Sequence, residues 1–471
     1  MSLGDLSCDR RFERYLDGLA KVMGHADRVG PLRDYCTGLM LPCERKSVEP
    51  MAAVTAPGRT SAQHQSLLHF VGQGAWSDEQ VLCKVREMVL PEMERQGPIE
   101  AWIIDDTAFP KKGKHSVGVG RQYCGQLGKQ ENCQAAVSLS LANHHASLPV
   151  CYQLYLPQDW AGDAARRRKA GVPTEIEFKT KPEIAIDQIR WAAKNGLTPG
   201  VALMDVGYGN NSWLRSEIGA LSLCYVAGIR ADTTVWPPGA KLLARKKNRK
   251  PGPTRVSRRD KNNPVSVKEL ALALPKRAWR TVGWREGSNE RLSSRFARVR
   301  VRAANDEVLR DEEWLLIEWP QGEKEPVKYW LSTLPPDTTF DRMVDLAQLR
   351  WRIERDYQEL KQEFGLGHFE GRGWRGFHHH ATLCIAAYGF LISERETIPP
   401  SGYRSTTWSE ALALPADDRP RGAAAANAAS HPELHRHNAH PHDRRARQTS
   451  AAMSMLRTNK SDKKSNPLMT Q

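Results

Sequence analysis

Hydrophobic residues recur at helical spacing near the start of the chain, in RFERYLDGLAKVM (11–23) and again over residues 81–93. The SDEQ motif at 77–80 has a serine followed three residues later by glutamine, the pattern of a capping box, and it predicts where the second of these helices begins. We therefore expect a helical N-terminal domain over residues 1–96.

From residue 99 the pattern changes to short apolar runs rich in β-branched residues and separated by Gly, Asn and Pro, which is typical of strands. A helix and further buried strands follow, and this alternation predicts an α/β core whose first part covers residues 97–235. The predicted strands are AWIID (101–105), CQAAVSLSL (133–141), LPVCYQLYL (148–156), VALMD (201–205) and LCYVAGI (223–229), with a helix at 182–195.

The regular pattern breaks again over residues 236–311. Residues 241–260 contain nine Lys or Arg and a single Asp, which indicates an exposed, basic and mainly β insertion. Strand-like runs return at 313–319 and 328–334 and precede a long helix at 340–364, so we expect the second part of the core over 312–398. Residues 399–471 lack an apolar period and are predicted to be a disordered basic tail.

The net charge of the chain indicates the kind of partner it binds. The 471 residues carry a formal net charge of +15, and an excess of Lys and Arg favours DNA or RNA because binding releases phosphate counterions. The longest uncharged apolar run, 381–392, is shorter than the ~20 residues of a membrane span. Without a signal-peptide pattern either, we expect a cytoplasmic protein that has no membrane partner.

Two of the predicted strands end in an aspartate, Asp105 and Asp205. In an open α/β sheet the functional groups lie just beyond the strand ends, so both carboxylates would emerge at a site. Either residue alone also suits an ordinary turn, because Asp is common where strands end.

The helix predicted at 340–364 adds a third acid, Glu354. Glu359 and Glu363 fall on the side of this helix opposite to Glu354 and are expected to be solvated. An ordinary i,i+4 ion pair between Arg350 and Glu354 is the alternative interpretation of the polar face. Four polar residues form one narrow stripe at 100° per residue: Arg350, Glu354, Tyr357 and Lys361.

Carboxylates from two strand ends and a helix can hold two Mg²⁺ ions, or Mn²⁺ in their place, because these hard cations prefer oxygen ligands. One ion would activate an attacking water or 3′-hydroxyl, and the other would stabilise the leaving oxygen at phosphorus. The combination indicates nuclease or strand-transfer chemistry.

Several motifs together resemble the DDE transposases of bacterial insertion sequences, over roughly residues 10–400. These are IDDT (104–107), MDVGYG (204–209) and the segment 349–384. The sequence is most similar to insertion sequence family seven hundred and one, within the insertion-sequence-four-related group. That group's helix pattern places Tyr, Arg, Glu and Lys at fixed spacing, and the Tyr position is Ala347 here.

The resemblance implies an RNase H-like core in which Asp105, Asp205 and Glu354 bind the metal ions. Asp105 is preferred over its neighbour Asp106 because it aligns with the family's Asp-x-Thr motif. The resemblance also implies that Arg350 and Lys361 contact DNA near the scissile phosphate, and that the basic insertion helps to hold the DNA ends.

Other cations are candidates for DNA contacts. Lys111, Lys112 and Arg121 flank the first predicted acidic strand, where they could line the DNA path or form an exposed basic hairpin. Tyr357, in the polar stripe, is also a predicted DNA contact. The histidines at 144–145 and 378–380 are expected to be solvated or to face phosphate, since hard-oxygen chemistry does not favour them as ligands.

The expected function is therefore Mg²⁺-dependent cleavage and strand transfer at insertion-sequence ends. The protein is expected to act as a homodimer on DNA and to be nucleoid-associated. A metal-dependent nuclease without strand transfer is one alternative. A non-catalytic DNA-binding relic of a transposase is the other.

Overall fold

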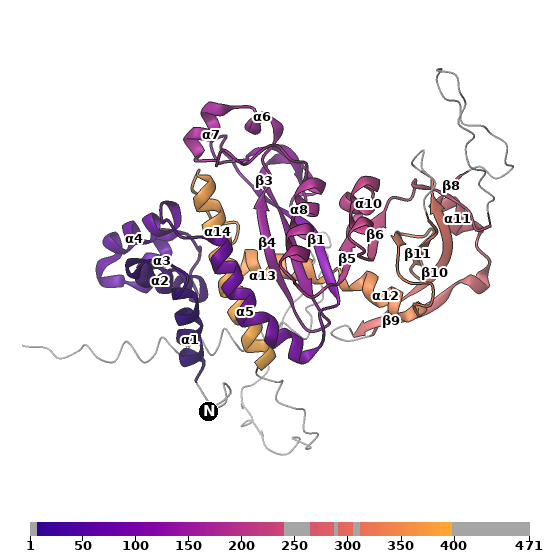
Figure 1. Ribbon diagram of the computed structural model, residues 1–471, viewed down its shortest axis with the longest axis horizontal. Coiled ribbons are helices and arrows are strands. Elements are labelled where there is room, and N and C mark those ends of the chain that lie inside the picture. Colours follow the sequence, from indigo (N-terminus) through magenta and orange to yellow (C-terminus); the bar gives the residue numbers. More distant parts are fainter. Residues whose placement is uncertain (1–6, 240–263, 287–290, 305–310, 398–471) are drawn as a thin grey trace, which may run out of the picture.

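The computed structural model describes most of the chain, and in it a sheet covered by helices confirms the predicted α/β class with an RNase H-like core (Figure 1). The predicted basic segment at 241–260 and the predicted tail at 399–471 lie outside the described residues. The structure describes residues 7–239, 264–286, 291–304 and 311–397.

β1 is the central strand of this core. It pairs antiparallel with β3 and parallel with β5, which in turn pairs parallel with β6, while β4 continues the antiparallel side beyond β3. β2 forms an additional hairpin with β3. The bounds are β1 Ala101–Pro110, β2 Gly120–Cys124, β3 Lys129–Ala142, β4 Ser147–Leu154, β5 Val201–Met204 and β6 Tyr225–Ile229.

The sheet does not end at β6. β12 pairs antiparallel with β6, and the order continues through β11, β10, β7 and β8, while β9 pairs with β10. The described part of the predicted β insertion therefore extends the same sheet. The bounds are β7 Thr234–Trp236, β8 Val265–Ser266, β9 Arg280–Glu286, β10 Arg291–Ala303, β11 Glu313–Trp319 and β12 Lys328–Ser332, with the short helix α11 at Val267–Ala273.

Side-chain alternation along β1 separates two buried layers. Ile103 packs in a cluster with Met343 and Leu346 of α12, whereas Ile104 belongs to the larger core together with Ile186 of α8. Helices therefore cover both faces of the sheet (Figure 1). Their bounds are α6 Gln158–Ala161, α7 Ala164–Ala170, α8 Lys181–Lys194, α9 Val206–Gly209, α10 Ser212–Ala220, α12 Phe340–Leu349, α13 Arg352–Gln362 and α14 Trp374–Thr397.

The N-terminal part of the chain is helical, as predicted, and it packs on α14. Tyr15 donates to the carbonyl of Ala386 at 2.8 Å, and the rings of Phe12 and Phe390 lie 4.9 Å apart. None of the described helices is long and apolar enough to cross a membrane. The N-terminal helices are α1 Cys8–Ala20, α2 Val29–Met40, α3 Val48–Thr55, α4 Thr60–Gly72 and α5 Asp78–Gln96.

The single helix predicted at 340–364 is wrong: α12 ends at Leu349 and α13 begins at Arg352. At the junction, the amide of Ile353 donates to Arg350 and the amide of Glu354 donates to Trp351, both across three residues instead of four. One tightened turn shifts the residues that follow by only a few tens of degrees, which leaves their apolar side chains on the side that faces the sheet. The hydrophobic period therefore continues across the break and could not reveal it.

Two expectations of solvent exposure are also wrong. Glu359 is buried, and Arg355 and Arg395 both pair with its carboxylate, at 3.0 and 2.7 Å. His379 and His380 are 1% exposed, and the ring of His379 stacks on Trp76 at 3.6 Å. Burial lowers the pKa of both histidines to about 4, so they are neutral core residues and do not face phosphate.

Candidate active site

Parallel pairing brings the two predicted acids side by side, although only Asp205 follows a strand end: the strand predicted to end at Asp105 continues to Pro110, because it stays paired with β3. Ile104 of β1 lies opposite Met204 of β5, so Asp105 and Asp205 are the next residues on neighbouring strands. Asp205 caps α9, since its Oδ1 accepts from the amide of Tyr208 at 3.1 Å. This cap fixes the Asp205 carboxylate beside β1.

Glu354 is connected to Asp105 through an arginine that pairs with both. The Arg350 guanidinium donates from Nη1 to Asp105 Oδ2 at 2.9 Å and from Nη2 to Glu354 Oε1 at 2.7 Å. Burial acts to lower the pKa of Arg350, but the charges of Asp105, Glu354 and Asp205 outweigh it and raise that pKa. Asp105 and Glu354 therefore share one cation, with Asp205 after the neighbouring strand, and within the described residues the oxygens of the three acids do not all approach to within 4.8 Å of one another.

Asp105 is largely buried beside other acids. Its side chain is 16% exposed, and burial raises its pKa to about 7, with Arg350 opposing and Asp205 and Asp106 adding to the rise. A carboxylate that is buried beside other carboxylates is stabilised by any nearby cation. The geometry therefore favours positive charge at this position, from Arg350 or from metal ions.

The adjacent Asp106 points to the other face of β1. Its carboxylate accepts from Lys181 Nζ at 2.7 Å and from the Tyr208 hydroxyl at 3.2 Å. Because these partners satisfy Asp106, the arrangement favours Asp105 as the acid that faces Glu354. The sequence carried no signal for Lys181, while Tyr208 lies within the MDVGYG motif quoted above.

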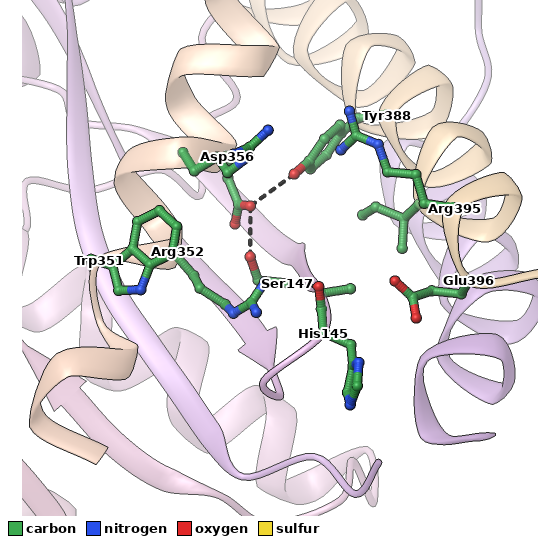
Figure 2. Close-up of a pocket in the computed structure, with 11 residues that line it drawn as sticks. His145, Ser147, Trp351, Arg352, Asp356, Tyr388, Arg395 and Glu396 are labelled. Atoms are coloured by element: carbon green, nitrogen blue, oxygen red, sulfur yellow. Dashed lines mark hydrogen bonds between the residues drawn. The ribbon is translucent and has the colours of Figure 1, made fainter. Parts of the chain in front are cut away.

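A buried polar network holds the back of α13 (Figure 2). Asp356 is 2% exposed, and its Oδ1 accepts from the hydroxyls of Ser147 at 2.6 Å and Tyr388 at 2.8 Å. Burial raises the pKa of Asp356 to about 7. These contacts attach α13 to β4 and α14, and Glu354 on the opposite side of α13 is exposed. Sequence reasoning did not identify Asp356, since a single Asp on a charged helix carries no signal of burial.

The predicted basic residues lie at two depths. Lys361 is partly buried, donates to the carbonyl of Ala108 at 3.1 Å and lies over the ring of Phe109. Lys111 donates to the carbonyl of Phe369 at 2.8 Å, whereas Lys112 and Arg121 are exposed. Burial lowers the pKa of Lys361, while Asp105 and Asp106 act in the opposite direction. Lys361 therefore belongs to the acidic site, whereas Lys112 and Arg121 are accessible beyond the far end of β1 and on β2.

Tyr357 does not fit the predicted DNA contact. It is 8% exposed, and its hydroxyl shares a 2.8 Å hydrogen bond with Ser138 of β3. The helical stripe put Tyr357 on the same side of the helix as Glu354, and on this side the sheet is close enough to bury the ring. Tyr357 instead packs α13 onto β3.

Comparison with known proteins identifies the family of this chain. A family model described as DDE superfamily endonuclease matches residues 18–291, which is more than half of the chain. The chain belongs to the DDE superfamily of endonucleases. The part that matches the superfamily contains Asp105 and Asp205 and ends before Glu354.

A relative of this superfamily member supports the transposase resemblance. The chain is 30% identical over 169 residues to a protein of Microchaete diplosiphon named "Probable transposase for insertion sequence element IS701". The similar region is 36% of this chain and 41% of that protein, so the chain spans about two fifths of the length of the relative.

Proposed function

We propose that this protein is a DDE transposase that binds insertion-sequence ends and catalyses cleavage and strand transfer of DNA. The observation that carries the proposal is that Asp105 and Glu354 both pair with the Arg350 guanidinium, while Asp205 lies beside Asp105 after the neighbouring strand. Membership of an endonuclease superfamily and similarity to a probable transposase support it.

The donor set fits Mg²⁺. Asp105, Asp205 and Glu354 offer only carboxylate oxygens, the ligands that Mg²⁺ and Mn²⁺ prefer, and they would hold two such ions. When bound, the ions would activate the attacking oxygen and stabilise the leaving oxygen at phosphorus. In this proposal water first cleaves the phosphodiester at the element end, and the freed 3′-hydroxyl then attacks target DNA without a covalent enzyme intermediate.

The surrounding cations would position the DNA. Arg350 and Lys361, beside Asp105, would contact the phosphates nearest the reacting bond, and the exposed Lys112 and Arg121 would contact the backbone further away, with Lys111 between them. We also propose that the helical module at 1–96 recognises the element ends and that the basic insertion at 236–311 helps to hold them. Joining two ends requires at least a homodimer on DNA, which would act at the nucleoid in the cytoplasm.

The test uses purified full-length protein, a labelled element end and a target plasmid in the presence of Mg²⁺. We expect cleavage and joining by the unsubstituted protein, and loss of both by Asp205→Asn and Glu354→Gln with end binding retained. Glu363→Gln is the matched control, because Glu363 is exposed on the same segment. Cleavage retained by Asp205→Asn would refute the assignment.

The same assay separates the two alternatives. Cleavage without joining would identify a metal-dependent nuclease. End binding without cleavage in Mg²⁺ or Mn²⁺ would identify a DNA-binding relic, in which Arg350 serves as the permanent cation of the acidic site.

A further inference from the structure

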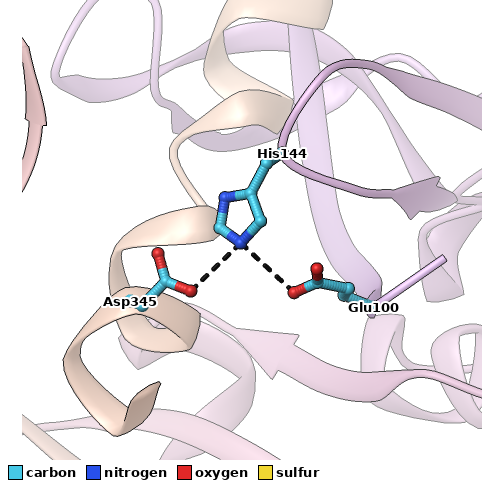
Figure 3. A group of neighbouring side chains, drawn as sticks. All are labelled: Glu100, His144 and Asp345. Carbon is cyan, nitrogen blue, oxygen red and sulfur yellow. Dashed lines mark ion pairs between the residues drawn. The ribbon is translucent and has the colours of Figure 1, made fainter. Parts of the chain in front are cut away.

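A second group of potential metal ligands lies at the start of β1, away from Asp105 in the middle of that strand (Figure 3). Glu100 directly precedes β1, His144 lies in the turn between β3 and β4, and Asp345 belongs to α12. One ligand atom from each residue lies within 4.8 Å of the other two. Glu100 is five residues before Asp105, a separation of roughly 16 Å along a strand, so this group is distinct from the proposed catalytic acids.

The spacing of these atoms resembles a coordination shell. His144 Nε2 lies 3.2 Å from Glu100 Oε2 and 3.0 Å from Asp345 Oδ2. In a tetrahedral Zn²⁺ site, bonds of about 2.0–2.2 Å place neighbouring ligand atoms about 3.4 Å apart. Both distances from His144 are thus within a few tenths of an ångström of that spacing, and the Glu100 and Asp345 oxygens lie within 4.8 Å of each other.

The ligand types select the class of ion. An imidazole combined with two carboxylates suits a borderline cation such as Zn²⁺, whereas Mg²⁺ prefers oxygen ligands alone. The side chains of Glu100, His144 and Asp345 are 16%, 42% and 30% exposed, so an ion can enter from solvent, and a water can complete the shell.

A positive charge already occupies this group. Arg342 Nη1 lies 2.5 Å from Glu100 Oε2 and 3.0 Å from Asp345 Oδ2, the same two oxygens that face His144. The Arg342 side chain is 40% exposed and comes from the surface of α12, so it can turn outward when an ion replaces it. Arg342 and a metal ion therefore compete for the same pair of carboxylates.

We propose that Glu100, His144 and Asp345 form a second metal site, specific for Zn²⁺ or a similar borderline cation. An ion here joins the start of β1, the β3–β4 turn and α12, three segments that are far apart in sequence. The site stabilises the end of the sheet on which α12 packs, and it does not depend on the proposed transposase activity.

The test is calorimetric titration of the full-length protein with Zn²⁺, in an Asp205→Asn, Glu354→Gln background that removes two of the proposed catalytic ligands. We expect one Zn²⁺ per chain, binding at least tenfold weaker in His144→Ala, and unchanged binding in His145→Ala. His145 is the matched control because it is the exposed neighbour outside the group. Zn²⁺ should also raise the melting temperature of the control and not that of His144→Ala.

A second variant tests the competition. Arg342→Gln removes the guanidinium and leaves all three ligands, so it should bind Zn²⁺ more tightly than the protein that retains Arg342. Equal Zn²⁺ binding by His144→Ala and His145→Ala would overturn the proposal. So would an absence of binding when Arg342 is present, even if Arg342→Gln gained a site, because Arg342 would then be the permanent cation of the group.

Discussion

The Arg350 guanidinium lies 2.9 Å from Asp105 Oδ2, although the two residues are 245 positions apart in sequence. Asp105 lies in the middle of β1, between two buried stretches of that strand, and Arg350 occupies the tightened turn between α12 and α13. The contact joins Asp105 of β1 to the segment that carries Glu354. It thus makes one site out of two distant parts of the chain.

Replacement of Arg350 by Gln should destabilise the protein when Mg²⁺ is absent. Asp105 would lose its cation while remaining buried, at a cost of about 2–4 kcal/mol in the free energy of unfolding. Added Mg²⁺ should recover part of this loss by supplying positive charge to the same carboxylates. Urea denaturation with and without Mg²⁺ measures both effects. Equal stability of the variant and the unsubstituted protein in metal-free buffer would contradict this role of Arg350.

Asp105→Asn and Asp106→Asn should differ in their effect on cleavage. Asp105 faces Arg350 and Glu354, so its loss should lower the cleavage rate by more than roughly 100-fold, whereas Asp106 binds Lys181 and should matter less, by about 10-fold. Single-turnover cleavage of a labelled element end gives the comparison, and circular dichroism checks the fold. An Asp106→Asn protein that is folded and as inactive as Asp105→Asn would reverse the choice of ligand.

Glu359→Gln should be strongly destabilising although Glu359 lies on a highly charged helix. The substitution leaves Arg355 and Arg395 without their shared carboxylate in a buried position, at a cost of about 3 kcal/mol. Glu363→Gln, four residues later and exposed, should change stability by no more than about 0.5 kcal/mol. Midpoints of urea denaturation test the contrast, which disappears if Glu359 is solvated.

Asp356 should make the stability of the protein depend on pH. Its pKa is about 7 in the folded state, against about 3.9 in an unfolded chain, so between these values the folded state binds the extra proton. The free energy of unfolding should therefore fall as pH rises toward and through 7, by at most about 1.4 kcal/mol per pH unit from this group.

Asp356→Asn removes this contribution while nearly preserving the shape of the side chain. Other carboxyls, including Asp105, titrate in both proteins and cancel in the comparison. The stability difference between the two proteins, from urea denaturation at pH values between about 4 and 8, should change with pH in the direction given. A difference that is the same at every pH would show that Asp356 keeps an ordinary pKa.

The elements that carry the site were predictable because they depend on local pattern. The apolar runs before Asp105 and Asp205 predicted both strands, and their parallel pairing places the two acids side by side, although β1 continues beyond Asp105 to Pro110. The stripe from Arg350 to Lys361 also persists in the structure, because a single three-residue turn shifts the residues after it by only a few tens of degrees. The break itself was not predictable, for the same reason.

What the sequence determined by itself was the order of strands and helices, the positions of three acids, and the resemblance that connects them to DNA chemistry. Only the tertiary structure decided which charges are buried and with whom they pair. Glu359 is neutralised by an arginine 36 residues away, Tyr357 bonds to a serine 219 residues away, and Glu100 meets an arginine 242 residues away. Periodicity describes one helix or strand at a time, whereas the environment of a charge is set by whichever segments the folded chain packs against it.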